Sequence, residues 1–215
     1  MADGKERGGR GKSPRILITG GPTVEDVDPV RFLSNRSSGR MGLALAGAAV
    51  RAGCETRLIL GPTQLEPPAE TNPVRVRSAA EMLAAVLDNL SWADALIMAA
   101  AVADYTPAEP SGAKLKKGKG ELFLRLKRTD DILLRVGARP ERRGMCLVGF
   151  SLDVSVNLEE GRRKQKDKGL DLMLVNSAES FGSGLSRAWL LSAAGEEDCG
   201  LIAKEKLAER IVERV

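Results

Sequence analysis

Polar side chains that could bind an anion gather in front of one segment of this sequence that is rich in small residues. Asn35, Arg36, Ser37 and Ser38 come directly before a predicted helix that begins near Gly39. The first turn of a helix has free N–H groups and the positive end of the helix dipole, so these side chains and the helix could share an oxyanion or a phosphate. The alternative is that Ser37 or Ser38 only caps the helix.

Lysines form two further clusters, of which the first lies in a loop flanked by glycines, residues 112–120. The loop carries Lys114, Lys116, Lys117 and Lys119. Ammonium groups on a mobile loop could close over a polyphosphate and neutralise the charge that develops during transfer. The alternative is a solvated, charged loop without such a role.

The second cluster lies in a charged segment, residues 157–168. On a helix, Lys164 and Lys168 are four residues apart and share one face, so both could reach a single anion. Glu159 and Glu160 could instead pair with neighbouring basic residues, which would make the cluster structural.

Three aspartates could complete a nucleotide site. Asp104 follows a buried strand, and Asp130 and Asp131 begin a short predicted helix. Their carboxylates could contact a base, a ribose or Mg²⁺. Asp130 and Asp131 could instead serve the N-terminus of that helix.

The composition excludes several kinds of chemistry. The 215 residues include no histidine, which removes Ser–His–Asp and Cys–His catalysis and histidine metal ligands together. A net charge of +4 and an aromatic content of 3% argue against nucleic acid as a partner, and no apolar run is long enough to span a bilayer. We therefore expect a cytoplasmic protein whose chemistry rests on Lys, Arg, Asn, carboxylates and a bound ligand.

The scaffold predicted for these groups is an α/β fold with a Rossmann-like, doubly wound, mostly parallel sheet, because strands alternate with helices along the chain. A buried strand at residues 16–18 ends at Gly20 and Gly21, whose backbone can approach a phosphate or carboxylate closely. The polar segment that follows is predicted to be a long loop.

Further elements follow from hydrophobic spacing and turn residues. We predict strands at residues 55–60, 74–76, 93–101, 145–150, 171–175 and 187–191, and helices at 39–52, 78–90, 130–136, 157–168 and 204–215. Thr129 is expected to cap the third of these helices, and an alternating segment at 121–126 predicts a hairpin or a small flap strand. Residues 1–14 predict a disordered tail or linker in front of a single domain, residues 15–215.

Six motifs follow one another along this domain. The first is TGGPTVEDVDPVRFLSNRSSGRMG, residues 19–42. The others are AAVADY (100–105), KLKK (114–117), DIL (131–133), VGF (148–150) and KGLDL (168–172). In their sequence and spacing they resemble the phosphopantothenate–cysteine ligases, also called phosphopantothenoylcysteine synthetases, which in many bacteria form the C-terminal half of a bifunctional coenzyme A biosynthesis flavoprotein.

The resemblance implies a ligation in two steps. A nucleoside triphosphate, CTP in most bacterial members, reacts with the carboxylate of 4′-phosphopantothenate to give an acyl-nucleotide and pyrophosphate, with Mg²⁺ on the triphosphate and no metal ligand assigned in the protein. The amine of L-cysteine then displaces the nucleotide. The choice between CTP and ATP stays open. The alternative function is a non-catalytic nucleotide-binding module of the same fold.

The resemblance also implies which residues act. Asn35, Arg31 and Lys114 match the catalytic positions, with Lys114 on the triphosphate, and Asn35, Ser37, Ser38 and Ala101 are expected to bind substrate. The nucleotide-binding positions are Gly20, Gly21, Met98, Ala99, Ala100, Asp104, Lys114, Asp130, Asp131, Ile132, Leu133, Phe150, Lys164 and Lys168.

Family members are homodimers, so we expect a homodimer here, with residues 121–126 as the exchanged or interfacial element. The linker-like N-terminus favours a piece excised from a fusion with a flavin-dependent decarboxylase over a stand-alone ligase. The chain departs from the family pattern at Asp130, where proline is usual, at Asp153, where glutamate is common, and in the segment around Phe181.

Overall fold

The computed structural model describes residues 13–153, 155–177 and 184–215. Most of the expected N-terminal tail, and Phe181 with its neighbours, lie outside the described residues. None of the helices within these ranges is long and apolar enough to cross a membrane.

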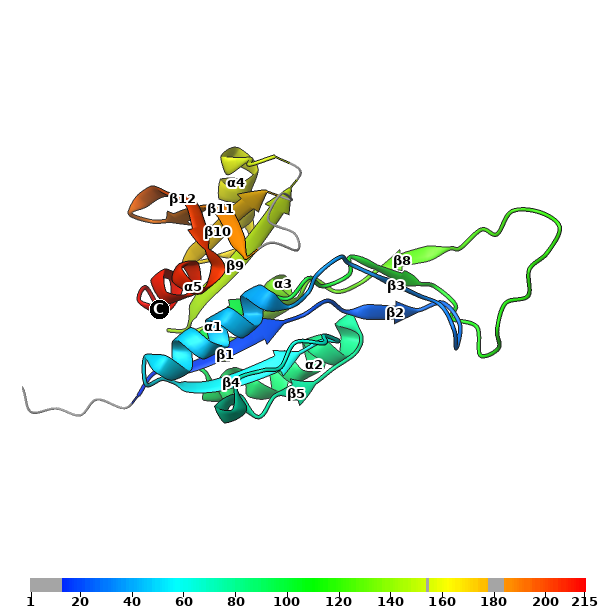
Figure 1. Ribbon diagram of the computed structural model, residues 1–215, viewed down its shortest axis with the longest axis horizontal. Helices are drawn as coiled ribbons and strands as arrows, with labels where there is room; N and C mark the ends of the chain where they lie inside the picture. The colour runs from blue at the N-terminus through cyan, green and yellow to red at the C-terminus, as the bar shows by residue number, and fades with distance from the viewer. Residues whose placement is uncertain (1–12, 154, 178–183) are drawn as a thin grey trace, which may run out of the picture.

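A sheet of eight strands forms the centre of the fold (Figure 1). In spatial order the strands are β12 (Gly195–Ala203), β11 (Leu185–Ser192), β10 (Leu172–Ser177), β9 (Cys146–Asp153), β6 (Ala95–Met98), β1 (Arg15–Gly20), β4 (Glu55–Leu60) and β5 (Val74–Arg75). The β11 strand is antiparallel to β10 and β12 is antiparallel to β11, whereas the other neighbours are parallel. The predicted doubly wound, mostly parallel sheet is confirmed, and β12 was not predicted.

Helices cover both faces of this sheet. Helices α1 (Arg40–Arg51) and α5 (Lys204–Val212) pack together on one face, and α2 (Ala79–Asn89), α3 (Ile132–Gly137) and α4 (Leu158–Lys168) lie on the other. Ile16 and Ile18 of β1 belong to the first apolar core and Leu17 to the second. The uninterrupted apolar run of β1 therefore reflects a strand that is buried on both faces. Short 3₁₀ helices are η1 (Ala69–Thr71), η2 (Leu90–Trp92) and η3 (Pro140–Arg142).

Two small antiparallel strand pairs extend from one end of the sheet as an arm, defined here as residues 24–34 and 105–128 (Figure 1). Strands β2 (Val24–Asp26) and β3 (Phe32–Ser34) form a hairpin, and β7 (Tyr105–Pro107) pairs with β8 (Leu126–Arg128). The β2–β3 hairpin occupies the segment that was predicted to be a loop, because strands of three residues are too short to show a period of two. The predicted flap strand at 121–126 is displaced to β8, and the lysine loop lies at the tip of the arm.

The predicted Thr129 cap is wrong, and so is the alternative that Ser37 or Ser38 caps the first helix. Gly39, with φ of 78°, is the N-cap of α1, so neither Ser37 nor Ser38 caps it. Asp131 caps α3 by accepting a hydrogen bond from the Leu134 N–H, whereas Thr129 donates its hydroxyl to the Ala103 carbonyl at 2.6 Å. Both corrections arise from loop geometry, which spacing along the chain does not reveal.

The start of α1 is held against the end of β1 by a glycine contact. A Cβ at Gly42 would lie 2.5 Å from the Gly20 Cα, a backbone atom that cannot rotate away. Gly42→Ala should therefore destabilise the fold by about 1–2 kcal/mol, since an overpacking cost of about 1–3 kcal/mol exceeds the helix propensity gain of up to about 1 kcal/mol.

Gly47→Ala on the same helix is the matched control. Its Cβ would meet the end of the flexible Arg51 side chain, so we expect unchanged or slightly higher stability. Urea unfolding of both variants measures the difference, and equal stability of the two would contradict the close-contact explanation.

Candidate functional site

A cleft of about 1010 Å³ opens where the carboxyl end of β6, strand β9 and the N-termini of α1 and α3 meet. The chain order places it at a switch point, because from β1 the chain proceeds outward through β4 and β5 and then returns to β6 on the other side. Ligands of open α/β sheets bind at such points. Many of the residues expected to bind nucleotide or substrate line the cleft: Asn35, Ser37, Ser38, Met98, Ala99, Ala100, Ala101, Asp104, Asp130, Asp131, Ile132, Leu133, Phe150, Lys164 and Lys168.

The N-terminus of α1 forms one wall of the cleft. Gly39, Arg40 and Met41 all line it, and the first turn of α1 contains no acidic residue. Ser37 Oγ accepts a bond from the Gly39 N–H at 3.3 Å, so it shapes the loop in front of the helix. The free N–H groups and the dipole of this twelve-residue helix favour an anion at this wall.

Asn35 connects this wall to the segment that follows β6. Its amide nitrogen donates to the carbonyl of Ala101 at 3.2 Å and to the carbonyl of Val102 at 3.0 Å. Both amide hydrogens are therefore used within the protein. What Asn35 offers to a ligand in this arrangement is its Oδ1 acceptor, whereas the expected oxyanion or phosphate would need its donors.

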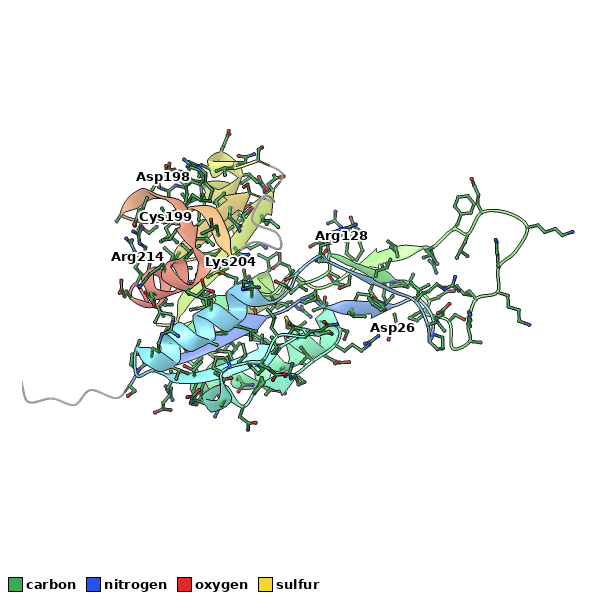
Figure 2. The ribbon with its side chains drawn as sticks, in the orientation of Figure 1. Asp26, Arg128, Asp198, Cys199, Lys204 and Arg214 are labelled. Atoms are coloured by element: carbon green, nitrogen blue, oxygen red, sulfur yellow. The ribbon has the colours of Figure 1, made fainter. Side chains whose placement is uncertain are left out.

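Three lysines line the cleft: two belong to α4, on the other face of the sheet from α1, and one begins α5, which packs against α1. Lys168 Nζ forms an ion pair with Asp131 at 2.7 Å, and Lys164 Nζ lies 3.2 Å from the Ser151 hydroxyl. The prediction that Lys164 and Lys168 face the same space is confirmed by their shared lining of the cleft. Lys204 lies at the start of α5, beside α1 (Figure 2). It is buried, and burial together with the Arg40 guanidinium lowers the pKa of its ammonium group.

The carboxylates of the cleft differ in their surroundings. Asp131 both caps α3 and pairs with Lys168, and Asp130 pairs with Arg135 at 3.3 Å. Asp104 also lines the cleft, and its backbone carbonyl accepts a bond from the Thr129 N–H at 3.0 Å. Among the described residues no group of three or more His, Cys, Asp or Glu side chains could hold a metal ion.

Four of the expected site residues do not line this cleft. Gly20 and Gly21 serve close packing, since a Cβ on Gly21, which has φ of 77°, would lie 2.9 Å from the Gly61 carbonyl oxygen. Arg31 and Lys114 lie on the arm, in the turn between β2 and β3 and in the lysine loop. The catalytic roles of Arg31 and Lys114 stay predictions. A role for Lys114 in catalysis requires that the arm reaches a cleft, either that of its own chain or that of a second copy.

The structure also adds residues that sequence reasoning missed. Arg40, Asn176 and Lys204 line the cleft, and Asp28, at the turn of the arm, is buried beside Arg31. No sequence pattern identifies Lys204 as a cleft residue, because a lysine at the start of an amphipathic helix is expected to face solvent. Asp28 could have been noticed from the sequence only weakly, because it is a carboxylate followed by proline inside the first motif.

Comparison with known proteins assigns the chain to a family. Residues 11–215 match the model of the DNA/pantothenate metabolism flavoprotein C-terminal domain. The chain belongs to this family. This assignment confirms the resemblance to phosphopantothenate–cysteine ligases, and the domain is of the type found at the C-terminus of coenzyme A biosynthesis proteins.

Two curated relatives and one solved structure illustrate the family. The coenzyme A biosynthesis bifunctional protein CoaBC of Bacillus subtilis is 44% identical over 172 residues, which are 79% of this chain and 41% of that protein. A cysteine/cysteine sulfinic acid decarboxylase from an unknown prokaryotic organism is 44% identical over 171 residues, 79% of this chain and 47% of that protein. The crystal structure of the C-terminal domain of CoaBC superimposes with a TM-score of 0.79 at 34% identity and covers 94% of this chain and 93% of that one. The chain thus spans about half the length of the curated relatives it matches.

Proposed function

We propose that this domain ligates 4′-phosphopantothenate and L-cysteine in coenzyme A biosynthesis in the cytoplasm, through an acyl-nucleotide that is an acyl-cytidylate when CTP is used. The observation that carries the proposal is the convergence of the α1 N-terminus, Asn35 and the two lysines of α4 on one cleft. The 44% identity to CoaBC from Bacillus subtilis supports the substrate class.

The first step forms the acyl-nucleotide. A carboxylate oxygen of phosphopantothenate attacks the α-phosphorus, and the bond to the β-phosphate oxygen breaks, which releases pyrophosphate. Lys164 and Lys168 lie on one wall, where their charges stabilise phosphate oxygens. The α1 N-terminus across the cleft can hold a second anion, which suits a substrate that itself carries a phosphate.

The second step forms the amide. The amine of cysteine attacks the activated carbonyl carbon and loses a proton, and the nucleoside monophosphate leaves with the electron pair of the broken acyl–oxygen bond. Asn35 Oδ1 would accept a hydrogen bond from the incoming amine, since the amide hydrogens of Asn35 are held by the carbonyls of Ala101 and Val102. Such a bond orients the nucleophile without needing a histidine base.

Mg²⁺ fits this cleft as an ion that arrives on the triphosphate. Mg²⁺ prefers phosphate oxygens with one or two carboxylates, and the described residues contain no protein-only cage. Asp104 would supply such a carboxylate, because it lines the cleft, whereas Asp130 and Asp131 already pair with Arg135 and Lys168. The ion supplies neutralisation of the triphosphate charge.

We also propose that two copies associate through the arm. Phe123 is 84% exposed, and other large apolar side chains of the arm are exposed as well: Val30, Phe32, Tyr105, Leu122, Leu124 and Leu126. An apolar patch of this kind on an extended element is typical of an interface. A second copy would cover it and would bring Lys114 of one chain toward the cleft of the other, and light scattering should give about twice the 23.0 kDa of one chain.

The test of the function is pyrophosphate release by the purified protein with Mg²⁺, 4′-phosphopantothenate and L-cysteine, with CTP and ATP compared in parallel. We expect turnover with CTP. Turnover with both nucleotides would assign relaxed base choice to the turn at Asp130, which departs from the family pattern. Folded protein that is silent with every nucleotide would refute the ligase and favour a non-catalytic nucleotide-binding module.

A further inference from the structure

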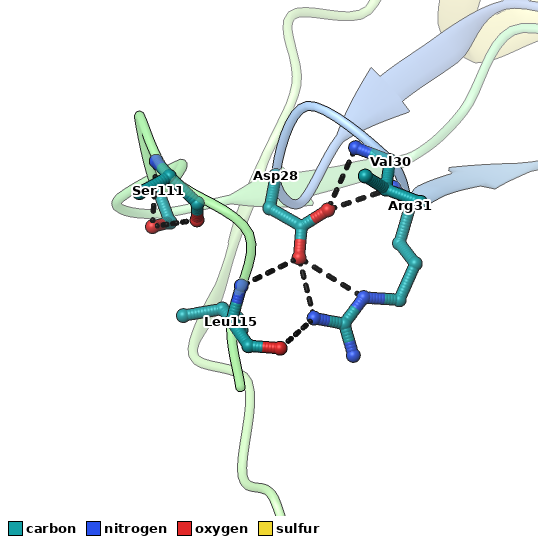
Figure 3. Close-up of polar contacts among 6 residues, drawn as sticks. Asp28, Val30, Arg31, Ser111 and Leu115 are labelled. Atoms are coloured by element: carbon teal, nitrogen blue, oxygen red, sulfur yellow. Dashed lines mark hydrogen bonds and ion pairs between the residues drawn. The ribbon is translucent and has the colours of Figure 1, made fainter. Parts of the chain in front are cut away.

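A buried carboxylate at the turn of the β2–β3 hairpin joins the two halves of the arm (Figure 3). The Asp28 side chain has no exposed surface, and its Oδ1 accepts bonds from the Val30 and Arg31 N–H groups, both at 2.8 Å. Its Oδ2 accepts bonds from Arg31 Nε at 3.0 Å and from the Leu115 N–H at 3.1 Å. The Arg31 guanidinium beside Asp28 holds the pKa of this carboxyl well below its usual range, so it is ionised at neutral pH.

Arg31 completes a closed arrangement around Leu115. Its Nη2 donates both to Asp28 Oδ2 and, at 2.7 Å, to the Leu115 carbonyl. The N–H and the C=O of Leu115 are therefore both held by side chains of the hairpin, much as a neighbouring strand would hold them. We call Asp28, Arg31 and Leu115 the arm clip.

The arm clip is the last anchor before a long free span. Within the described part of the chain, residues 116–124 form no hydrogen bond, and the next contact is the Arg125 carbonyl with the Ala108 N–H at 2.9 Å. Leu115 is the neighbour of Lys114, so fixing the Leu115 backbone fixes where the Lys114 side chain leaves the arm. Without the clip, the lysine would belong to a free loop of more than ten residues.

Resting on the ligase function proposed above, we infer that Asp28 is a positioning residue, which acts through Leu115 to place the Lys114 ammonium group on the triphosphate. Two of the five N–H groups that donate to Asp28, the backbone N–H groups of Val30 and Arg31, only close the hairpin turn. The contacts with the Leu115 N–H and the Arg31 guanidinium reach the lysine loop, and they carry the inference. A displacement of about 1 Å at a charge-stabilising group costs on the order of 100-fold in rate. Loss of the arm clip can therefore lower the reaction rate substantially.

The experiment measures pyrophosphate release for Asp28→Asn in the wild-type background and in Lys114→Gln. Asparagine can keep the Oδ1 acceptor for the hairpin turn, but its amide nitrogen then replaces the anionic Oδ2 that accepts from the Arg31 guanidinium and the Leu115 N–H. We expect kcat to fall by about 10- to 100-fold in the wild-type background and to change by less than about twofold in the Lys114→Gln background. A role confined to folding would lower the rate equally in both backgrounds, and that result, or no loss at all, would overturn the inference.

Asp26→Asn is the matched control. Asp26 lies on β2 of the same hairpin (Figure 2) and pairs with an arginine, Arg77, at 2.6 Å, but it has no contact with the lysine loop. It should keep wild-type kcat, and a loss as large as that of Asp28→Asn would count against the inference.

Leu115→Pro covers the case that Asp28→Asn does not fold. It leaves Asp28 in place and removes the Leu115 N–H that Asp28 accepts, and the proline ring also restricts the backbone at residues 114 and 115. It should show the same loss of kcat and the same insensitivity in the Lys114→Gln background. An inactive wild-type protein would refute the ligase function itself, and the positioning role would fall with it. An active wild type with normal kcat in Asp28→Asn overturns the positioning role alone.

Discussion

Lys114→Gln should slow pyrophosphate release by about 30- to 900-fold, which corresponds to a loss of about 2–4 kcal/mol of transition-state stabilisation. The reason is that an ammonium group held on the triphosphate stabilises charge that develops on the phosphate oxygens as the bond to pyrophosphate breaks. Glutamine has a similar length and can donate a hydrogen bond, but it lacks the charge.

The matched control for this substitution lies in the same loop. Lys119→Gln removes an equal charge from a residue beyond Gly118, outside the arm clip, and should change the rate by less than about twofold because an exposed charge on a free loop is screened by solvent. Stopped-flow or coupled measurement of pyrophosphate under saturating nucleotide gives both rates. An unchanged rate in Lys114→Gln would refute the role on the triphosphate.

Asn35→Ala should impair amide formation more than activation. Removal of the side chain deletes the Oδ1 acceptor for the cysteine amine and also releases the Ala101 and Val102 carbonyls that the amide nitrogen holds. We expect about a 30-fold loss in the second step, or about 2 kcal/mol, while pyrophosphate release in a single turnover without cysteine stays largely intact. Equal loss in both half-reactions would count against this role.

Asn35→Asp separates the two functions of the side chain. It keeps an acceptor oxygen for the amine, but it places a carboxylate beside the carbonyl oxygens of Ala101 and Val102, which can no longer receive a donor. A second step as slow as that of Asn35→Ala would assign the effect to loop positioning, whereas a faster one would assign it to the acceptor.

The two slowed variants also test the dimer. If the arm of one copy serves the cleft of the other, a mixed dimer of Lys114→Gln and Asn35→Ala contains one intact site. Random exchange of subunits should then restore about a quarter of wild-type turnover, because half of the dimers are mixed and each has one working cleft. No recovery after verified subunit exchange would place Lys114 in the cleft of its own chain.

Much of the fold was predictable because it follows from local patterns. The apolar run at residues 16–18 is buried on both faces, and the spacing of Met82 and Val86 places both on the buried side of α2. Ser78 caps that helix by accepting from the Glu81 N–H, three residues on, which is the spacing of a capping box, and the Glu81 carboxylate accepts from the Arg77 N–H. Patterns of this kind depend on neighbours within one turn or one strand, so a single sequence contains them.

The candidate site was predictable in composition but not in arrangement. Residue types and motif order identified Asn35, Lys164, Lys168 and the aspartates of α3 as a group, and all of them line one cleft. They come from three separate segments, and Asn35 precedes the other two by more than 90 residues, so their convergence depends on the order of strands in the sheet. That Asn35 presents an acceptor and not its donors was decided by the backbone carbonyls of Ala101 and Val102, which no spacing reveals.

By itself the sequence determined the fold class, the absence of histidine chemistry and the family, because composition, periodicity and motif order are properties of the chain. Only the tertiary structure decided that Gly20 and Gly21 serve packing and that Lys114 lies on an arm outside the cleft. It also decided that the Asp28 carboxylate is buried within that arm. The physical reason is the same for all three. Each of these features depends on which distant segments of the chain contact one another in space. The residue type at one position does not specify which segment packs against it.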